Sequence, residues 1–221
     1  MKIVALVPMK HNSERVPGKN FKNFSGRPLF YYIIKSLLDS PLISDVVVNT
    51  DSHYIQNIAT ANFPTVQVIQ RPSELCGDMV PMNEILLYDV SQVDADFYLQ
   101  THCTNPLLKP DTITNAVSTF LDNYPAHDSL FSVTRLQKRL WDKSGSPINH
   151  DPMVLLRTQD LPPLYEENSC VYIFTGGNLK ERRNRMGARP LMFEMDAEEA
   201  FDIDTPLDFK MAELLYSLRL K

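Results

Sequence analysis

The sequence predicts a three-layer α/β fold, in which helices cover both faces of a predominantly parallel sheet. Short apolar runs such as Ile3 to Val7 lack polar alternation, which is typical of strands buried on both faces. Segments with helical spacing of apolar residues separate such runs along most of the chain, as crossover connections do. Polar or charged residues follow several runs, at the strand ends where such folds bind ligands. We therefore expect a Rossmann-like single domain over residues 1–221.

Length and composition are ordinary for one globular domain. The 221 residues are 43% hydrophobic and 22% charged, which is enough chain to bury a core. No apolar run reaches the length of a bilayer span and no signal-peptide pattern opens the sequence, so we expect a soluble, cytoplasmic protein. The three cysteines form no C-x-x-C pair, which argues against disulfides and zinc. A net charge of -5 provides no electrostatic footprint for nucleic acid.

The loop after the first strand carries an excess of positive charge. Gly18 allows the backbone to approach a ligand and Pro17 stiffens the loop, so N–H groups and cations can converge on a phosphate. A solvated, lysine-rich loop is the alternative. The chain has neither G-x-G-x-x-G after its first strand nor a P-loop motif, which argues against a dinucleotide dehydrogenase or an ordinary P-loop ATPase. Only Glu14 opposes the cations of this loop, which are Lys10, Arg15, Lys19, Lys22 and Arg27.

Periodicity and turn residues define the elements of the first half. Pro28 suits the first position of a helix, and Asp51 is placed to cap the next one. Pro72 stops a strand directly after Arg71, because proline has no N–H to donate to a sheet. We expect helices at 28–40, 51–62 and 82–93, and strands at 45–50, 65–70 and 96–101.

The second half is less regular. Residues 135–168 contain Trp141 and several prolines but no periodic segment, so we predict an insertion into the sheet rather than another crossover. A tryptophan is costly to expose, which favours a docking arm and a homodimer. Around this inserted dimerisation subdomain we expect helices at 110–123, 178–185 and 206–220, and strands at 129–134, 170–175 and 190–195.

Two aspartates precede the last predicted helix. Thr205 and Asp208 form a capping box with Pro206 at the first helical position, so this helix does not need Asp202 and Asp204 as caps. Two carboxylates separated by one residue repel each other, which is tolerable beside a divalent cation. The pair therefore predicts a metal site.

Residues 10 to 20, KHNSERVPGKN, resemble the signature loop of the sugar-acid cytidylyltransferases, the CMP-N-acetylneuraminate and CMP-3-deoxy-manno-octulosonate synthetases. The family pattern is roughly R-x-x-S-x-R-[LF]-P-x-K-[NP], and the chain keeps the serine, second basic residue, proline, lysine and asparagine. Lys10 replaces an arginine, which keeps the charge but loses the fork geometry. Further motifs follow in order through nearly the whole chain, and DIDTPLDF at 202–209 is close to the family's magnesium motif. The resemblance implies a fold of the nucleotide-diphospho-sugar transferase type.

The resemblance also implies roles at the nucleotide end of the site. Lys10, Arg15 and Lys19 would contact the phosphates, and Ser13 and Asn20 would bind the nucleotide. Residues 71 to 78 resemble R-P-x-x-L-x-x-D, which assigns Arg71 to the cytosine edge and Asp78 to the same site. Asp202 and Asp204 would hold Mg2+, and Asp202 would take part in catalysis.

Other matches imply roles at the sugar end. Gln100 is kept from the family's Q-P-T-S-P-L-R, although two extra residues follow it and the expected arginine is missing. Lys138 and Arg157 on the insertion resemble landmarks that reach a partner's sugar carboxylate; the alternative is that both are exposed and idle. Asn168 matches an asparagine near the sugar. His102 with Cys103 is read as loop packing, and Arg185 as part of a linker or a solvated turn.

The reaction that we expect is transfer of CMP from CTP to the anomeric hydroxyl of an acidic, N-acetylneuraminate-like sugar, with release of pyrophosphate. Mg2+ and the cationic loop would offset charge on the triphosphate, so that the hydroxyl approaches the α-phosphorus in line. Two alternatives remain: the same fold acting on another sugar or nucleotide, and a non-catalytic nucleotide-sugar binding protein.

Overall fold

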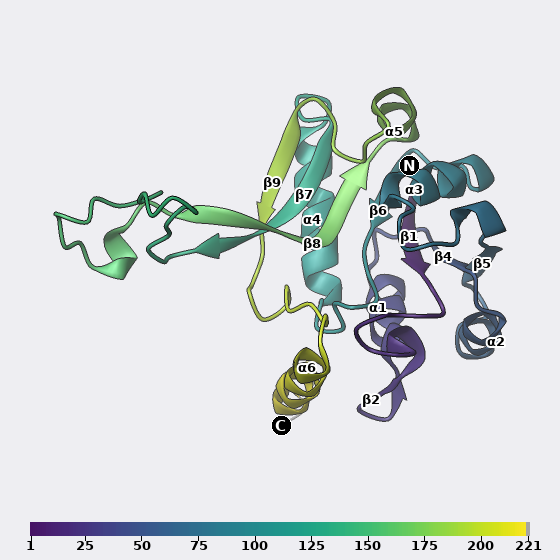
Figure 1. Ribbon diagram of the computed structural model, residues 1–221. Helices are drawn as coiled ribbons and strands as arrows, with labels where there is room; N and C mark the ends of the chain where they lie inside the picture. Colours follow the sequence, from purple (N-terminus) through teal and green to yellow (C-terminus); the bar gives the residue numbers. More distant parts are fainter. Residues whose placement is uncertain (220–221) are drawn as a thin grey trace.

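The computed structural model describes residues 1–219 and is organised around a seven-stranded sheet (Figure 1). The strands lie in the order β5-β4-β1-β6-β8-β7-β9. The first four are parallel, β8 is antiparallel to both neighbours, and β7 and β9 are parallel to each other. The sheet is therefore largely parallel, as predicted. Its strands are β1 (Ile3–Met9), β4 (Asp45–Thr50), β5 (Gln67–Gln70), β6 (Phe97–Gln100), β7 (Ser129–Leu136), β8 (Leu164–Phe174) and β9 (Pro190–Glu194).

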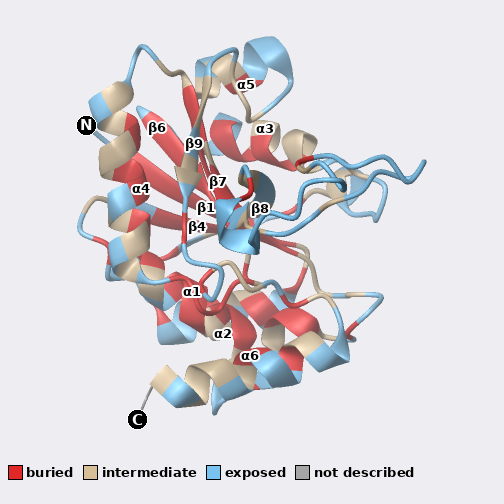
Figure 2. Ribbon diagram, turned by 90° about the vertical axis from the view of Figure 1, so that its left-hand side faces the viewer, coloured by how far each residue is buried: buried red, intermediate tan, exposed pale blue. Residues whose placement is uncertain are grey.

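Helices cover both faces of the sheet, which confirms the three layers. One apolar layer joins alternate residues of β1, including Ala5, to α1 (Leu29–Leu38), α2 (His53–Asn62) and α4 (Pro110–Asn123). The other joins Val4 and Leu6 to α3 (Met82–Gln92) and α5 (Gly176–Arg182). Successive residues of β1 thus enter different layers, which explains its continuous apolar sequence. Figure 2 shows the buried strands between helices whose outer surfaces are exposed.

The last helix, α6 (Pro206–Arg219), packs outside these layers. Its Phe209 and Ala212 contact Phe24, which lies in a small hairpin of β2 (Asn23–Phe24) and β3 (Arg27–Pro28) that the sequence does not predict. The capping box is confirmed, because Thr205 Oγ1 accepts from Asp208 N at 3.2 Å and Asp208 Oδ2 accepts from Thr205 N at 2.7 Å.

Most predicted elements are confirmed within a few residues, with two local corrections. The first strand continues past the apolar run Ile3 to Val7 and through Pro8 to Met9. β6 pairs with β1 only as far as Leu6, so the missing N–H of Pro8 faces no partner strand. The cap of α2 is Ser52 rather than Asp51: Ser52 Oγ accepts from Ile55 N at 3.2 Å, whereas Asp51 accepts from His11 N.

The predicted insertion is a hairpin arm formed where β7 and β8 extend beyond the sheet (Figure 1). Residues 151–160 are all exposed, including Met153 and Leu155 at 90% and 92%. The arm extends away from the rest of the chain, so nothing within residues 1–219 covers these side chains. Within the same residues, no helix is both long and apolar enough to cross a membrane.

Candidate functional site

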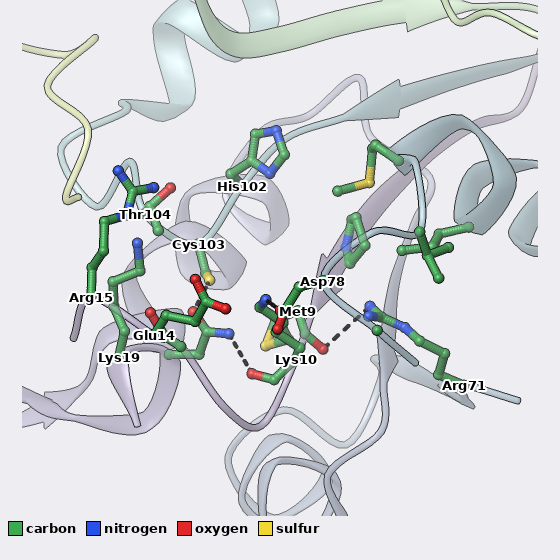
Figure 3. Close-up of a pocket in the computed structure, with 17 residues that line it drawn as sticks. Met9, Lys10, Glu14, Arg15, Lys19, Arg71, Asp78, His102, Cys103 and Thr104 are labelled. Atoms are coloured by element: carbon green, nitrogen blue, oxygen red, sulfur yellow. Dashed lines mark hydrogen bonds and ion pairs between the residues drawn. The ribbon is translucent and has the colours of Figure 1, made fainter. Parts of the chain in front are cut away.

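A cavity of about 290 Å³ opens at the carboxyl ends of the parallel strands. The loop after β1 forms one wall, the segment after β5 and the start of α3 form another, and the turn after β6 forms the third (Figure 3). Seven residues assigned to the site from the sequence line it: Lys10, Ser13, Arg15, Lys19, Asn20, Arg71 and Asp78. Residues separated by more than sixty positions thus meet as the parallel topology predicts.

Lys19 connects the cationic loop to the segment before α6. Gly18 precedes it with φ 63°, a left-handed conformation that suits glycine, and a Cβ there would lie 2.8 Å from the ring of Phe21. The turn buries the Lys19 side chain, whose Nζ donates to Ile203 O at 2.5 Å and lies 3.8 Å from Asp204 Oδ1. The lysine therefore places a buried positive charge between the loop and the two predicted metal ligands.

The other loop cations are more exposed. Arg15 Nη2 lies 2.7 Å from Asp204 Oδ1, and Lys10 pairs with Asp78. The hydrogen bond and charge of Lys10 hold the pKa of the Asp78 carboxyl below its ordinary value. Asn20 Nδ2 donates to Lys10 O at 2.7 Å and fixes the backbone of the loop. Both ion pairs are solvent-accessible, so an anion can displace them at little cost.

Arg71 is more deeply placed than the sequence indicates. Its side chain is buried, Nε donates to Asn49 Oδ1 at 2.7 Å, and Nη2 donates to Asn49 O at 3.2 Å and Met9 O at 3.4 Å. Within residues 1–219, the hydrogen bonds of the Arg71 side chain come from Nε and Nη2, and none comes from Nη1. Since Arg71 also lines the cavity, one terminal nitrogen remains for a ligand instead of the whole guanidinium fork.

Gln100 is fully buried at the end of β6, beside the cavity rather than in its wall. Its Oε1 accepts from Arg185 Nη1 at 2.5 Å, so its Nε2 must be the donor to His102 Nε2 at 3.1 Å. This bond leaves the proton of neutral His102 on Nδ1. Burial and the charge of Arg185 lower the pKa of His102 to about 4, so the ring is neutral near pH 7.

Sequence reasoning missed Arg185, His102 and Thr104. Arg185 stacks on the ring of Tyr172, 3.5 Å from its centroid, and burial lowers the pKa of the guanidinium. It was read as part of a linker because no strand or helix pattern surrounds it. The only available signal was its charge, next to a glycine and a proline. His102 and Thr104 line the cavity from the turn that the sequence assigned to packing.

Asp202 and Asp204 lie beside the cavity without lining it. Partial burial raises the pKa of Asp202, a hydrogen bond to Thr104 lowers it, and the charge of Asp204 raises it again. No cluster of three or more His, Cys, Asp or Glu side chains suited to a metal occurs in the described part of the chain. The metal-binding role of Asp202 and Asp204 stays a prediction.

Three predicted sugar residues do not join the cavity. Lys138 and Arg157 are exposed on the arm, where Arg157 Nε pairs with Asp160 Oδ2 at 2.6 Å. Asn168 is occupied within the sheet: Oδ1 accepts from Ser132 Oγ at 2.5 Å, and Nδ2 donates to Thr134 Oγ1 at 2.9 Å. These bonds hold the irregularity in the β7–β8 pairing. The sugar roles of all three residues remain predictions.

Comparisons with known proteins find relatives that are similar along nearly the whole chain. CMP-N,N'-diacetyllegionaminic acid synthase of Legionella pneumophila is 30% identical over 236 residues, covering 99% of this chain and 97% of that protein. N-acylneuraminate cytidylyltransferase A of Danio rerio is 30% identical over 219 residues, and the chain spans 50% of its length. Pseudaminic acid cytidylyltransferase of Campylobacter jejuni is 26% identical and is covered over 97% of its length.

The fold is shared with solved structures. CMP:2-keto-3-deoxy-manno-octonic acid synthetase in complex with CTP has a TM-score of 0.78 at 17% identity, covering 99% of this chain and 100% of that one. 4-Diphosphocytidyl-2C-methyl-D-erythritol synthase has a TM-score of 0.71 at 15% identity, covering 97% and 98%. A family model described as cytidylyltransferase matches residues 4–220. Because that match spans nearly the whole chain, and the Legionella relative is similar along its full length, the chain belongs to the cytidylyltransferase family.

Proposed function

We propose that the protein transfers CMP from CTP to the anomeric hydroxyl of a nonulosonic acid and releases pyrophosphate. One observation carries the proposal: Lys10, Arg15 and Lys19 line a cavity in which Arg15 and Lys19 lie at one side and Arg71 at the other, with Lys10 between them (Figure 3). Such a cavity can receive a triphosphate at one end and a base at the other. The named relatives act on acidic sugars, which supports the choice of acceptor.

The phosphate end would be held by exchange of ion pairs. In the free protein, Lys10 forms an ion pair with Asp78, and Arg15 forms one with Asp204. Phosphate oxygens would replace these carboxylates, and the lysines and arginine would stabilise the charge that develops on the departing pyrophosphate. Lys19 is already buried and fixed, so it adds charge stabilisation with little reorganisation.

The base end would be read by Arg71. Its Nη1 is a donor, and cytosine presents acceptors at O2 and N3, whereas uracil carries an N–H at N3. Met9 O and Asn49 hold the remaining nitrogens, so the guanidinium cannot turn to suit another base. Ser13 and Asn20 line the same cavity and are proposed to contact the nucleotide.

Mg2+ fits the available donors. It favours oxygen ligands, and it is commonly bound through one or two carboxylates with substrate phosphates and water. Asp202 and Asp204 provide two such carboxylates beside the cationic loop, and burial, together with the charge of Asp204, raises the pKa of Asp202. When bound, the metal would neutralise phosphate charge and increase the acidity of the attacking hydroxyl.

The acceptor sugar would lie next to Gln100. Arg185 is the cation closest to this amide, and it provides a partner for the sugar's carboxylate from within the same chain. Asn168 is proposed to support this region through the β7–β8 pairing. Lys138 and Arg157 are proposed to reach the same position in a second copy of the chain.

We further propose a cytoplasmic homodimer built through the arm, residues 135–168. The arm exposes the large apolar side chains of Trp141, Val154 and Leu155, and exposed apolar side chains gathered on one element are typical of a protein interface. The free thiols of Cys76, Cys103 and Cys170 are the state that a reducing cytoplasm maintains.

The test is pyrophosphate release with CTP and Mg2+ across a panel of nonulosonic and octulosonic acids. We expect turnover with CTP and at least one nonulosonic acid. Turnover only with another nucleotide or with an octulosonic acid would favour the alternative of a different substrate. Saturable CTP binding by calorimetry, without pyrophosphate release from any acid in the panel, would identify a binding protein and reject the enzyme.

A further inference from the structure

A chain of buried polar groups lies directly behind Arg71 and is not part of the cavity wall. Asn49 at the end of β4 and Asp89 in α3 are both 0% exposed. Asn49 Oδ1 accepts from Arg71 Nε at 2.7 Å, and Asn49 Nδ2 donates to Asp89 Oδ1 at 2.5 Å. The three side chains thus connect strand β4, the segment directly after β5 and helix α3 through two consecutive hydrogen bonds.

The direction of this chain is fixed by chemistry. The Nε of an arginine can only donate, so the oxygen of the Asn49 amide must face it and the amide nitrogen must face Asp89. Asp89 must then accept at Oδ1. No other orientation of the amide satisfies both neighbours.

Asp89 is costly to bury and has no structural reason to be a carboxylate. Its Oδ2 is buried without a hydrogen-bond partner in the part of the chain that the structure describes. A leucine or valine in α3 would fill this position against the sheet without that cost. Above its raised pKa of about 7, Asp89 is ionised and provides negative charge: Asp51 and Asp89 are the two carboxylates that act on Arg71, and only Asp89 is joined to it through Asn49.

The negative charge of Asp89 can stabilise the buried guanidinium of Arg71. Arg71 loses solvation by burial, which disfavours its charged form, and the chain through Asn49 offsets part of that loss. The hydrogen bonds through Asn49 also fix the rotation of the Arg71 guanidinium. Nη1 is then the nitrogen that remains free to bind a ligand. A free arginine would have several rotamers and five donors, which would suit either pyrimidine.

We propose that Asn49 and Asp89 are positioning residues that hold Arg71 in one orientation and thereby set the selectivity of the cavity for cytosine over uracil. This inference rests on the proposed function only in that CTP binds in this cavity. Neither residue lines the cavity, and both act through the arginine.

The first test removes the charge and keeps the hydrogen bond. Asp89→Asn still presents an oxygen to Asn49 Nδ2, so at pH 8, above the pKa of about 7 for Asp89, the substitution removes the negative charge and keeps this hydrogen bond. We expect the preference for CTP over UTP, measured by calorimetry and by KM, to fall by roughly tenfold, the difference between a charge-assisted and a neutral hydrogen bond. The kcat at saturating CTP should change by less than about twofold. Asp122→Asn, an exposed charge removal on α4, is the matched control and should keep the wild-type preference.

The second test is a reciprocal exchange. Asn49→Asp alone places two carboxylates in contact and should impair selectivity at least as much as Asp89→Asn. The double variant Asn49→Asp/Asp89→Asn restores the net charge: Asp at 49 accepts from Arg71 Nε, and Asn at 89 donates to it. We expect the preference for CTP to return to within about threefold of wild type, a recovery that restored packing alone would not produce.

The outcomes separate this inference from the proposed function. If Asp89→Asn keeps the wild-type preference, or if the folded double variant is no more selective than Asp89→Asn, the positioning role is wrong, whatever the turnover. Thermal melting identifies a variant that fails to fold. If a single variant fails to fold, the selectivity of the double variant, which keeps both hydrogen bonds, decides whether the positioning role is correct. A wild-type protein that prefers CTP but releases no pyrophosphate would reject the enzyme and leave the inference standing.

Discussion

Arg15 and Asp204 form an ion pair of 2.7 Å that joins the cationic loop to the predicted metal-binding segment across nearly the whole sequence. The pair is accessible to solvent and contributes little stability by itself. Its importance is its location, since both partners are proposed to change contacts when Mg2+ and CTP bind. Loading of the nucleotide would therefore begin with the opening of this pair.

We predict that Asp202→Asn and Asp204→Asn each reduce kcat by about a hundredfold, equivalent to roughly 3 kcal/mol of transition-state stabilisation. Each change removes one hard oxygen ligand from Mg2+. The capping box of α6 is made by Thr205 and Asp208, so the melting temperature should remain near that of wild type. Turnover measured across a magnesium titration checks this; unchanged turnover with unchanged magnesium dependence would exclude the pair as the metal site.

Arg71→Lys should raise KM for CTP by at least about tenfold, because a lysine cannot donate to Asn49 and present a second nitrogen to the base at once. The pocket would also be left with a buried amide oxygen without its donor. Initial rates with CTP and UTP measure the effect. Lys22→Ala, a charge removal outside the cavity wall, is the control; equal losses in both variants would reduce Arg71 to a general electrostatic contribution.

Arg185→Met should raise KM for the sugar acid by roughly tenfold or more and leave KM for CTP nearly unchanged. Methionine keeps apolar contact with Tyr172 but removes the charge beside Gln100. Kinetics with each substrate varied in turn provide the measurement. An increase confined to KM for CTP would place Arg185 at the nucleotide end instead.

Stability should depend on pH through Asp89. Burial raises its pKa in the folded protein from 3.8 to about 7, against the opposing effects of the Asn49 hydrogen bond and the charge of Arg71. Between these values the folded state holds a proton that the unfolded state releases, so this group's contribution to stability is full below pH 3.8 and is lost as pH rises to about 7. Asp89→Asn should remove this decline, which is on the order of a few kcal/mol, in urea unfolding at pH 5 and pH 8. A parallel pH dependence in wild type and variant would assign it to other groups.

The arm provides a prediction about assembly. Met153→Ser combined with Leu155→Ser removes two side chains that are almost fully exposed in one chain, so the fold of the monomer should be unaffected. We expect dissociation of the proposed dimer by light scattering at micromolar concentration, together with weaker use of the sugar acid. Arg182→Ser on the exposed surface of α5 serves as the control. A double variant that stays dimeric would move the interface elsewhere.

The sequence predicts the fold well because parallel strands and amphipathic helices have local signatures. Helix α4 matches its predicted bounds of 110–123 because both its apolar face and its first proline are contained in the segment itself. The β2–β3 hairpin has no such signature, since its strands have two residues each and are stabilised by contact with α6.

The candidate site likewise contains residues that the sequence predicts and residues that only the structure reveals. The sequence places Lys10, Arg15 and Lys19 in one candidate site because they form one local cluster, whose charge contrasts with the rest of the chain, and all three line the cavity. Arg185 and the Asn49–Asp89 pair were missed because their meaning depends on what lies next to them in space. An asparagine in a strand and an aspartate in a helix are unremarkable until a distance of 2.5 Å connects them.

The antiparallel strand β8 makes the arm a separable module. Because β7 and β8 leave the sheet side by side and remain paired with each other out to Leu136 and Leu164, shortening the hairpin beyond that pair changes no register within the sheet. A version of the protein with residues 140–160 replaced by a tight turn would therefore keep the nucleotide cavity, and arms of other lengths could be grafted at the same point. If the arm is the site of assembly, as proposed, assembly and nucleotide binding could diverge independently on one scaffold.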